Sequence, residues 1–547
     1  MNDGAARTAL KRLLGAVPLA AEASQWLKPG HAAPISGYSL EQLDEAIPGW
    51  VASAERARRS TDGGAPRRVL VIGYLKWWLE YASALGAVLA GLGHEVELGY
   101  LPYRRWYQPV VRFDARRQQL YLRRILRGLT PLLRLHDLSL EISAPLPAAL
   151  ELDLQDLSRI DVQYTLLRER LDLSQGTEDS SLYALRLERN RAAAGAAWRL
   201  LSHNRYDAVL IPNGSILEFG AIYRAARHAG VRVVTFEFGE QRDRMWLAQD
   251  AEVMLLETTD LWEARKDDPL TEAEAEAIQA LYRARRGGTA WGGFNRLWQM
   301  GESQGAQNAR AQLGLDPRRP VALLCTNVVG DSLSLGRELF SAGMAGWLAM
   351  TVRHFADRPE AQLVVRVHPG ESFGTADPSE GIIHAALPQL PGHVIVVPHD
   401  SPVNTYDLIE LAHLGLVYTT TAGIEMAMNG VPVVVAGRTH YRGKGFTNDP
   451  ANADDYLAAI DDLLRRPLGQ RLEGGLVELA WRYAHRFFFE YPFPFPWHSE
   501  HFWEDVGRYP PAWILDPAHR PPLELSLRAL VGLPIDWRER ALAAVAR

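Results

Sequence analysis

The sequence predicts an α/β protein with two doubly wound domains that face each other across a cleft, and with helical extensions at both ends. Short apolar runs alternate with helical patterns over residues 67–260 and again over residues 319–470. Most of these runs are apolar throughout, as in a parallel sheet that helices cover on both faces. The length of 547 residues also exceeds one ordinary core and suggests two domains.

The first domain opens with a strand–helix–strand unit. Residues 69–73 (VLVIG) are an apolar run that ends in glycine, residues 80–92 have helical spacing, and residues 94–98 begin the next strand. Two more strands are predicted at 208–211 and 231–236.

The helix between those last two strands carries signals at both of its ends. Ser215 is followed three residues later by Glu218, which is the spacing of a capping box, so the helix is predicted to begin there. It is predicted to end at Gly230, because glycine commonly follows the last helical residue. Glu218 therefore has a structural explanation, which weakens it as a catalytic candidate.

The second domain shows the alternation more regularly. Residues 261–318 are charged and carry no strand pattern, so they are predicted to connect the two domains. Residues 1–66 are predicted as a helical extension and linker, and residues 471–547 as a helical, aromatic tail. Prolines within 487–497 favour an extended path that packs the tail across both domains.

The predicted elements of the second domain are strands 321–325, 362–367, 393–397, 416–418 and 432–436, and helices 342–355, 404–413 and 423–429.

Doubly wound sheets bind ligands beyond the carboxyl ends of their strands, so the cleft between two such domains is the expected site. In the second domain a buried strand ends in Thr419, Thr420 and Thr421, and Gly423 lies in the first turn of a short helix. Free N–H groups at a helix start bind anions, and Glu425 could accept hydrogen bonds from ribose hydroxyls. The structural alternative is that the threonines only cap the helix and Glu425 complements its dipole.

A histidine–proline pair follows another strand of the same domain. The imidazole of His368 could donate a hydrogen bond to a phosphate oxygen, and Pro369 would fix its direction. The alternative is a surface histidine in a turn. Arg366, on the strand itself, is expected to face a helix or solvent.

Polar residues also follow the first strand of the second domain. Asn327, Asp331 and Ser332 form a loop that would hold a nucleobase or phosphates, or would simply lead into a helix. His399 and Asp400 end a further strand, where a nucleobase contact is a weaker hypothesis.

These segments resemble a known family. Residues 425–434 (EMAMNGVPVV) are similar to the nucleotide-binding signature of GT-B glycosyltransferases. The longer run 420–447, together with 365–371 (VRVHPGE), resembles the capsule polysaccharide biosynthesis family, which includes transferases of Kdo to lipid-linked acceptors. The resemblance implies a GT-B fold of two Rossmann-like domains, in which Glu425 contacts the donor ribose and His368 its phosphate.

The resemblance also implies a glycosyltransferase that moves a sugar from a nucleotide-sugar to a growing surface polysaccharide or glycolipid. CMP- and UDP-sugars are the favoured donors, the acceptor is a saccharide or a lipid-linked saccharide, and no cofactor is expected. Two alternatives stay open. One is a nucleotide-sugar epimerase of the same fold, and the other is a catalytically silent scaffold of a polysaccharide assembly system.

Transfer to an acceptor hydroxyl needs a group that takes its proton. Glu237 and Glu240, in the run TFEFGE, come at the end of a first-domain strand, where the resembled family has a similar glutamate–glycine ending. Asp243 is a weaker candidate. Other residues expected near the cleft, because they follow the first strand, are Gly73, Tyr74 and Lys76.

Several kinds of site are missing from the sequence. It has no GxGxxG after Val71, no GxxxxGK[ST], no HExxH and no clear DxD, so a metal-independent reaction without a dinucleotide is expected. Cys325 is its one cysteine, which excludes an internal disulfide. The net charge of −6 gives no reason to expect nucleic acid as a partner.

A cytoplasmic location is predicted. The apolar part of the N-terminus is broken by Pro18 and Glu22, which argues against a signal peptide, and no run approaches the roughly 18–20 apolar residues of a spanning helix. Arginines and aromatic residues alternate over 104–134, which suggests peripheral contact with the inner face of the membrane. A solvated helix face with paired arginines is the favoured alternative.

Overall fold

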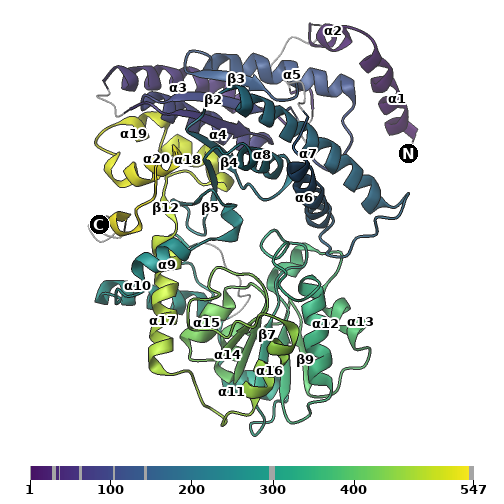
Figure 1. Ribbon diagram of the computed structural model, residues 1–547, viewed down its shortest axis with the longest axis vertical. Coiled ribbons are helices and arrows are strands. Elements are labelled where there is room, and N and C mark those ends of the chain that lie inside the picture. The colour runs from purple at the N-terminus through teal and green to yellow at the C-terminus, as the bar shows by residue number, and fades with distance from the viewer. Residues whose placement is uncertain are drawn as a thin grey trace.

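The computed structural model describes residues 2–26, 33–35, 37–60, 65–102, 105–140, 145–294 and 302–540. Two separate β-sheets organise this part of the chain, one in each half (Figure 1). The predicted α/β class with two doubly wound domains is confirmed. Parts of the predicted linker after residue 60, of the connection 261–318 and of the segment 104–134 lie outside the described residues.

The first sheet has the order β12-β6-β5-β4-β1-β2-β3. Its strands from β5 to β3 are parallel, whereas β6 and β12 pair antiparallel at one edge. The sequence analysis missed β3, in which Arg134 and His136 interrupt the apolar run, and β6, which follows β5 antiparallel without the intervening helix that marked the other strands. The strands are β1 (Arg68–Gly73), β2 (Glu95–Tyr100), β3 (Leu133–Asp137), β4 (Ala208–Pro212), β5 (Val233–Phe238), β6 (Arg244–Gln249) and β12 (Phe493–Pro494).

Helices surround this sheet. α4 is buried along nearly its whole length, which its alanine-rich sequence permits because small side chains let it approach β1 and β2 closely. The helices of this half are α1 (Asn2–Ala16), α2 (Ala20–Trp26), α3 (Glu41–Ser60), α4 (Lys76–Gly91), α5 (Arg112–Leu126), α6 (Ala148–Leu166), α7 (Glu178–His203) and α8 (Leu217–His228).

The predicted capping box at Ser215 is wrong. α8 begins at Leu217 without a side-chain cap. The Leu217 N–H instead donates to Asp161 Oδ1 of α6 at 2.6 Å. Glu218 is fully buried and accepts hydrogen bonds from Arg186 at 3.2 and 3.0 Å. A side chain from a distant helix therefore takes the capping role that the sequence pattern assigned to Ser215.

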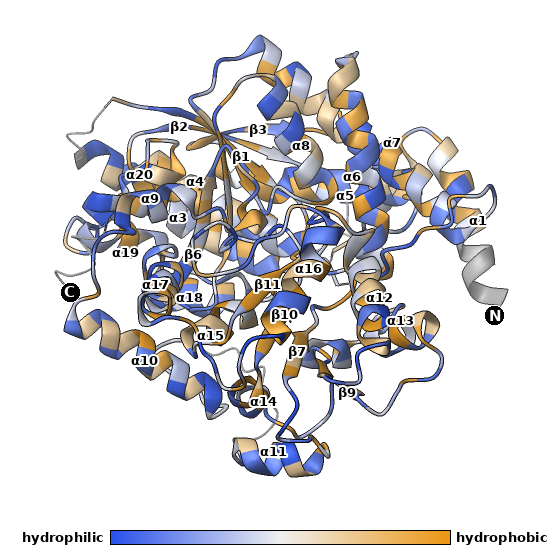
Figure 2. Cartoon of the chain, turned by 60° about the horizontal axis from the view of Figure 1, so that its bottom comes forward, coloured by the Kyte–Doolittle hydropathy of each residue, from blue (hydrophilic) through white to orange (hydrophobic). Residues whose placement is uncertain are grey.

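The second sheet has the order β11-β10-β7-β8-β9, and all its pairs are parallel. Its strands β7, β10 and β11 are buried along their whole length, and Figure 2 shows their apolar character. The strands are β7 (Val321–Cys325), β8 (Gln362–Arg366), β9 (Val394–Val397), β10 (Leu414–Val417) and β11 (Val433–Val435). The helices are α11 (Ala306–Gln312), α12 (Gly343–Ala356), α13 (Ser379–Ala386), α14 (Thr405–Leu411), α15 (Ala422–Met428) and α16 (Ala453–Leu464).

The connection and the tail both run between the two halves. In Figure 1 the tail passes from α17, beside the second sheet, to α18–α20, beside the first. Residues Arg486–Glu490 form a π-helical turn, so the extended path predicted for 487–497 starts only after it and leads into β12. The helices are α9 (Thr259–Arg265), α10 (Glu272–Arg286), α17 (Gly474–His485), α18 (Phe502–Arg508), α19 (Pro511–Leu515) and α20 (Glu524–Leu530).

Candidate functional site

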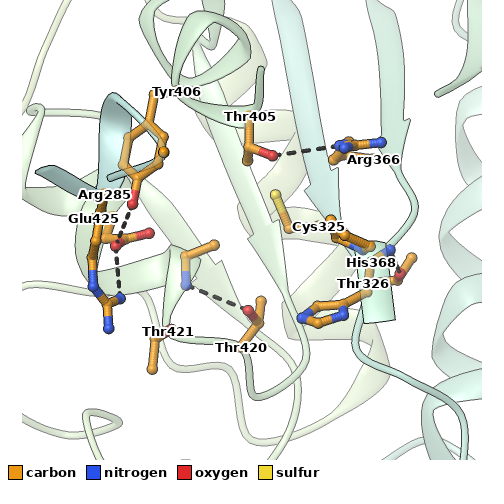
Figure 3. Close-up of a pocket in the computed structure, with 13 residues that line it drawn as sticks. Arg285, Cys325, Thr326, Arg366, His368, Thr405, Tyr406, Thr420, Thr421 and Glu425 are labelled. Carbon is orange, nitrogen blue, oxygen red and sulfur yellow. Dashed lines mark hydrogen bonds and ion pairs between the residues drawn. The ribbon is translucent and has the colours of Figure 1, made fainter. Parts of the chain in front are cut away.

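A cavity of about 110 Å³ opens at the carboxyl ends of β7 and β8 and at the start of α15. Figure 3 shows Arg285, from α10 of the connection between the domains, together with side chains of the second domain around this cavity. Of the predicted donor-binding residues, His368, Pro369, Thr420, Thr421 and Glu425 line this cavity. The other lining residues are Arg285, Gly288, Cys325, Thr326, Arg366, Thr405, Tyr406 and Ala422.

His368 is held by hydrogen bonds to both its backbone and its ring. Its backbone N–H donates to Thr326 Oγ1 at 2.9 Å, and its ring Nδ1 accepts from the Gly370 N–H at 2.9 Å. Because Nδ1 is an acceptor, the proton of the neutral ring lies on Nε2. The ring can therefore donate from Nε2 to an anion, as the phosphate role requires.

The Glu425 carboxylate is oriented by two donors. Tyr406 donates its hydroxyl to Oε1 at 2.7 Å, and Arg285 Nη1 lies 3.1 Å from the same oxygen (Figure 3). The side chain is 8% exposed. A carboxylate held this firmly at a cavity wall is suited to accept hydrogen bonds from a bound hydroxyl compound.

Arg285, like Tyr406, lines the cavity and was missed by the sequence analysis. It comes from α10 and forms ion pairs with both Glu425 and Glu240, while its guanidinium lies 4.5 Å from the centre of the Phe488 ring. Nothing in the local sequence of α10 marks it, because its partners lie 45 and 140 residues away. Arg366 was expected to face a helix or solvent. It is buried, donates to Thr405 Oγ1 at the start of α14, and lines the cavity.

Two predicted donor-binding residues hold the loops of the cavity rather than lining it. Thr419 donates from its hydroxyl to Leu333 O at 3.2 Å, and its N–H donates to Asn327 Oδ1 at 3.2 Å. Thr419 and Asn327 thus tie together the loops that follow β10 and β7.

Gly423 also lies outside the lining, and the space beside it explains why this position is glycine. A Cβ at this position would meet Tyr441 Oη at 2.5 Å. That hydroxyl donates to Thr420 O at 2.7 Å, so the glycine lets Tyr441 support the threonine loop.

A second cavity, of about 600 Å³, lies at the carboxyl ends of β1, β4 and β5 of the first sheet. Asp331 and Ser332 of the second domain line this cavity and not the first one, so it lies between the two domains. Asp331 and Ser332 thus lie apart from the predicted donor-binding residues that line the first cavity, because their loop crosses toward the first domain, and their contact with the donor stays a prediction.

Glu237 lies in this second cavity and is 9% exposed. Its carboxylate accepts from Asn213 Nδ2 at 3.1 Å and from the Phe238 N–H at 3.2 Å. Burial raises the pKa of Glu237 to about 7, in spite of these two donors. A carboxyl with this pKa can exchange a proton near neutral pH, which is what a general base needs.

The other carboxylates considered as catalytic residues have different surroundings. Glu240 is paired with Arg285, and the Asp243 side chain is 68% exposed, 3.7 Å from Arg244. Neither lines the cavity that holds Glu237. Of the segment after β1, the lining residues are Leu75, Trp77 and Trp78 rather than the expected Gly73, Tyr74 and Lys76.

Unusual backbone conformations concentrate around the second cavity. Leu75, Asn213 and Leu217 have φ of 62°, 60° and 57°, and all three line it. Residues other than glycine rarely adopt this left-handed region, and such strain of order 1–3 kcal/mol each is found preferentially at functional sites. The geometry thus marks this cavity independently of its chemistry.

Residues 291–462 match the family model described as capsule polysaccharide biosynthesis protein. The second domain therefore resembles the proteins of that family, as the sequence predicted. The matched stretch includes His368, Thr420, Thr421 and Glu425, whereas Arg285 and Glu237 lie before it. No match is found among curated protein sequences.

Solved structures with some likeness include enzymes that act on sugars. One is "KpsC, beta Kdo 2,4 transferase" of Thermosulfurimonas dismutans (18% identity over 51% of this chain and 79% of that one, TM-score 0.34). Another is the UDP-GlcNAc 2-epimerase of Neisseria meningitidis (11%, covering 81% and 100%, TM-score 0.24). A third is a glycosyltransferase of Rickettsia africae (8%, covering 86% and 100%, TM-score 0.27). Because these TM-scores lie below 0.5, the likenesses do not assign an activity to this chain.

Two groups of the described residues bring potential metal ligands within 4.8 Å of one another. In the first, His498 already engages Gly239 O at 3.3 Å and the Glu500 N–H at 3.4 Å through its two ring nitrogens. In the second, the carboxylates of Glu274 and Glu490 are paired with Arg486. Metal independence stays a prediction.

The arginine-rich segment 104–134 forms α5 and its surroundings. Arg116 pairs with Glu22 at 2.8 Å, and Arg123 with Asp137 at 3.4 Å. These pairs support the interpretation as a solvated face, and the membrane contact stays a prediction. Within the described part of the chain no helix combines the length and apolar character that spanning a bilayer requires.

Proposed function

We propose that the chain transfers a sugar from a nucleotide-sugar to a saccharide or lipid-linked saccharide acceptor in capsule or surface polysaccharide assembly. The observation that carries this proposal is the pairing of two unlike cavities at facing strand ends. One is small and basic, with an imidazole, two guanidiniums and a helix start. The other is larger and holds a buried carboxyl whose pKa is about 7.

In this proposal the nucleotide lies in the cavity of the second domain. Glu425 accepts from ribose hydroxyls, and His368 Nε2–H donates to a phosphate oxygen. Thr420 and Thr421 add hydroxyl donors beside the start of α15. The cationic groups stabilise the negative charge that develops on the leaving phosphate, which reduces the barrier without a metal ion. CMP- and UDP-sugars are the proposed donor classes.

The acceptor lies in the cavity of the first domain. Glu237 takes the proton of the acceptor hydroxyl while the oxygen of that hydroxyl forms a bond to the anomeric carbon of the donor sugar. The bond from that carbon to the phosphate oxygen breaks, and its electron pair stays on the phosphate. Approach of the two domains brings the two reactants together and excludes water. A cytoplasmic location is part of the proposal.

The two alternatives make different demands on the molecule. An epimerase needs no acceptor, and a silent scaffold needs no ionisable group in a cavity. A separate second cavity with Glu237 at its wall favours transfer over both.

The test is a thermal-shift screen of the full chain against CMP, UDP, GDP, dTDP and ADP, each with and without magnesium. A ligand at 100 times its Kd should stabilise the fold by about 2.7 kcal/mol, which raises the melting temperature measurably. Stabilisation by one nucleotide is expected and names the donor class. If none of the nucleotides shifts the transition, the donor site assigned to His368 and Glu425 is wrong.

A further inference from the structure

The cavity around Glu237 differs from the donor cavity in the aromatic character of its walls. Trp77 lies at this cavity with 44% of its surface exposed, whereas Trp78 and Trp246 are buried at 6% and 8%. Trp106 is fixed, because its Nε1–H donates to Thr165 Oγ1 at 3.1 Å. The aromatic lining residues are Trp77, Trp78, Trp106, Tyr164, Phe219, Phe238 and Trp246.

The charges of this cavity all have one sign. Its ionisable lining residues besides Tyr164 are Glu237, Asp331 and Glu500, and no Lys, Arg or His stands among the described residues that line it. Burial is the largest cause of the raised pKa of Glu237 and of Tyr164; Glu500 adds to the first, and Asp331 and Glu237 add to the second. An anion placed here would be repelled by these carboxylates, since the described lining residues offer no Lys, Arg or His to attract it.

A neutral sugar fits both features. One face of a pyranose ring presents C–H groups, which pack against an indole, while its hydroxyls need polar partners around the rim. The cavity offers such partners in Asn213, Ser332 and Ser499, besides its carboxylates. The large exposed surface of Trp77 is then available for stacking, as in pockets that combine aromatic walls with a few placed polar groups.

We infer that the Glu237 cavity takes the uncharged end of a saccharide, stacked on Trp77 with a hydroxyl directed at Glu237, and that it discriminates against acidic sugars and phosphates. This inference rests on the proposed function and names the class of acceptor for that same site. It separates the two cavities by charge, since the donor cavity holds Arg285, Arg366 and His368 beside the carboxylate of Glu425, and suits the anionic nucleotide.

The test compares matched probes that differ only in one carboxylate. Methyl β-glucoside and methyl β-glucuronoside, and the corresponding galactose pair, are titrated into the full chain at pH 7.5 with saturation-transfer NMR as readout. At least one neutral probe is expected to bind, and its acidic counterpart to bind about tenfold more weakly, equivalent to about 1.4 kcal/mol. Equal or tighter binding of the acidic probes, or no binding by either neutral probe, overturns the inference.

Variants locate the binding on the cavity. Trp77→Ala should weaken binding of the neutral probe about tenfold. The control Trp26→Ala, which removes a tryptophan that is 90% exposed on α2, should leave this binding unchanged. Glu500→Gln should narrow the gap between neutral and acidic probes, because it removes one repelling charge. Equal loss in both tryptophan variants would place the probe elsewhere.

The same samples distinguish the two proposals. A nucleotide shift without binding of any neutral saccharide overturns this inference and leaves the donor site standing. Binding of neutral saccharides without any nucleotide shift overturns the proposed transferase and leaves a saccharide-binding cavity.

Discussion

Glu237 shows how burial can prepare a single carboxyl for proton transfer. Its pKa is raised to about 7, with burial as the largest cause and Glu500 contributing in the same direction. If the ionised form is the general base, kcat/KM should rise with pH and level off above about 7. Glu500→Gln should move this midpoint to lower pH, because it removes a neighbouring negative charge. A profile that is flat from pH 5 to 9 would exclude Glu237 as the base.

The same residue has a stability signature that a merely structural glutamate of ordinary pKa would not show. Since the pKa of Glu237 in the folded state lies above the ordinary glutamate value of 4.5, the folded state keeps its proton where the unfolded state has lost it. Folding stability should therefore fall as pH rises from about 4.5 to about 7. Glu237→Gln should remove this fall and reduce transfer by roughly 10²–10⁴-fold. Urea unfolding across this pH range measures the first effect.

His368 is the residue whose role can be tested with the least disturbance. Because Nδ1 accepts from Gly370, the proton of the neutral ring lies on Nε2, and this N–H is the proposed donor to a phosphate. His368→Ala should weaken nucleotide binding by about 1.5–3 kcal/mol, or roughly 10–150-fold in Kd, as measured by calorimetry. His384→Ala, which removes an exposed histidine of α13, is the control. An unchanged Kd for His368→Ala would remove the phosphate role.

A site residue could be predicted from the sequence where the sheet topology alone places it, and could not be predicted where distant side chains place it. His368, Thr420 and Glu425 directly follow strands or open a helix, and topology alone brings such positions to one edge of a parallel sheet. Arg285 and Tyr406 were missed, because they reach Glu425 from helices with no local motif. The position of Asp331 in the cavity between the domains could not be predicted, since a loop's direction depends on packing that no sequence spacing encodes.

At the scale of elements, apolar runs located every parallel strand except β3. β3 (Leu133–Asp137) was missed because Arg134 and His136 alternate with its leucines, as charged side chains commonly do near a sheet edge. β6 (Arg244–Gln249) was missed because it follows β5 antiparallel, without the intervening helix that marked the parallel strands. The start of α8 was misplaced for a different reason. A capping residue can come from anywhere in the fold, and here Asp161 of α6 supplies it.

The network that fixes α8 is buried and ionic, so it should be sensitive to loss of one member. Arg186 lies 3.1 Å from Asp161 and 3.0 Å from Glu218, and the three side chains are fully buried. Arg186→Ala should lower the free energy of unfolding by about 3–5 kcal/mol, because it leaves two carboxylates without their cation. Arg191 lies on the same helix as Arg186 and forms a more exposed pair with Glu151 of α6. Arg191→Ala should therefore cost at most about 1 kcal/mol. Comparable losses in both variants, measured by urea unfolding, would contradict this account.

At the scale of the whole molecule, the two sheets are joined by more than the chain that connects them. The tail adds β12 to the first sheet, with Phe493 opposite Met245, after α17 has packed on α15 of the second domain. Arg285 adds a polar link, because it pairs with Glu240 of the first domain and with Glu425 of the donor cavity. Any relative movement of the domains during a reaction must therefore act on this arginine.

A double-mutant cycle on Glu240 and Glu425 tests that link. Either Glu→Gln change leaves Arg285 one carboxylate partner, whereas both together leave a nearly buried guanidinium with neither. The double variant should therefore lose more stability than the sum of the single variants, by about 0.5–3 kcal/mol in urea unfolding. The matched control pairs Glu240→Gln with Glu410→Gln, whose partner is the adjacent Arg286, and this cycle should be additive. Additivity in both cycles would mean that Arg285 does not couple the domains, and that the donor and acceptor cavities are linked only through the packing of the tail.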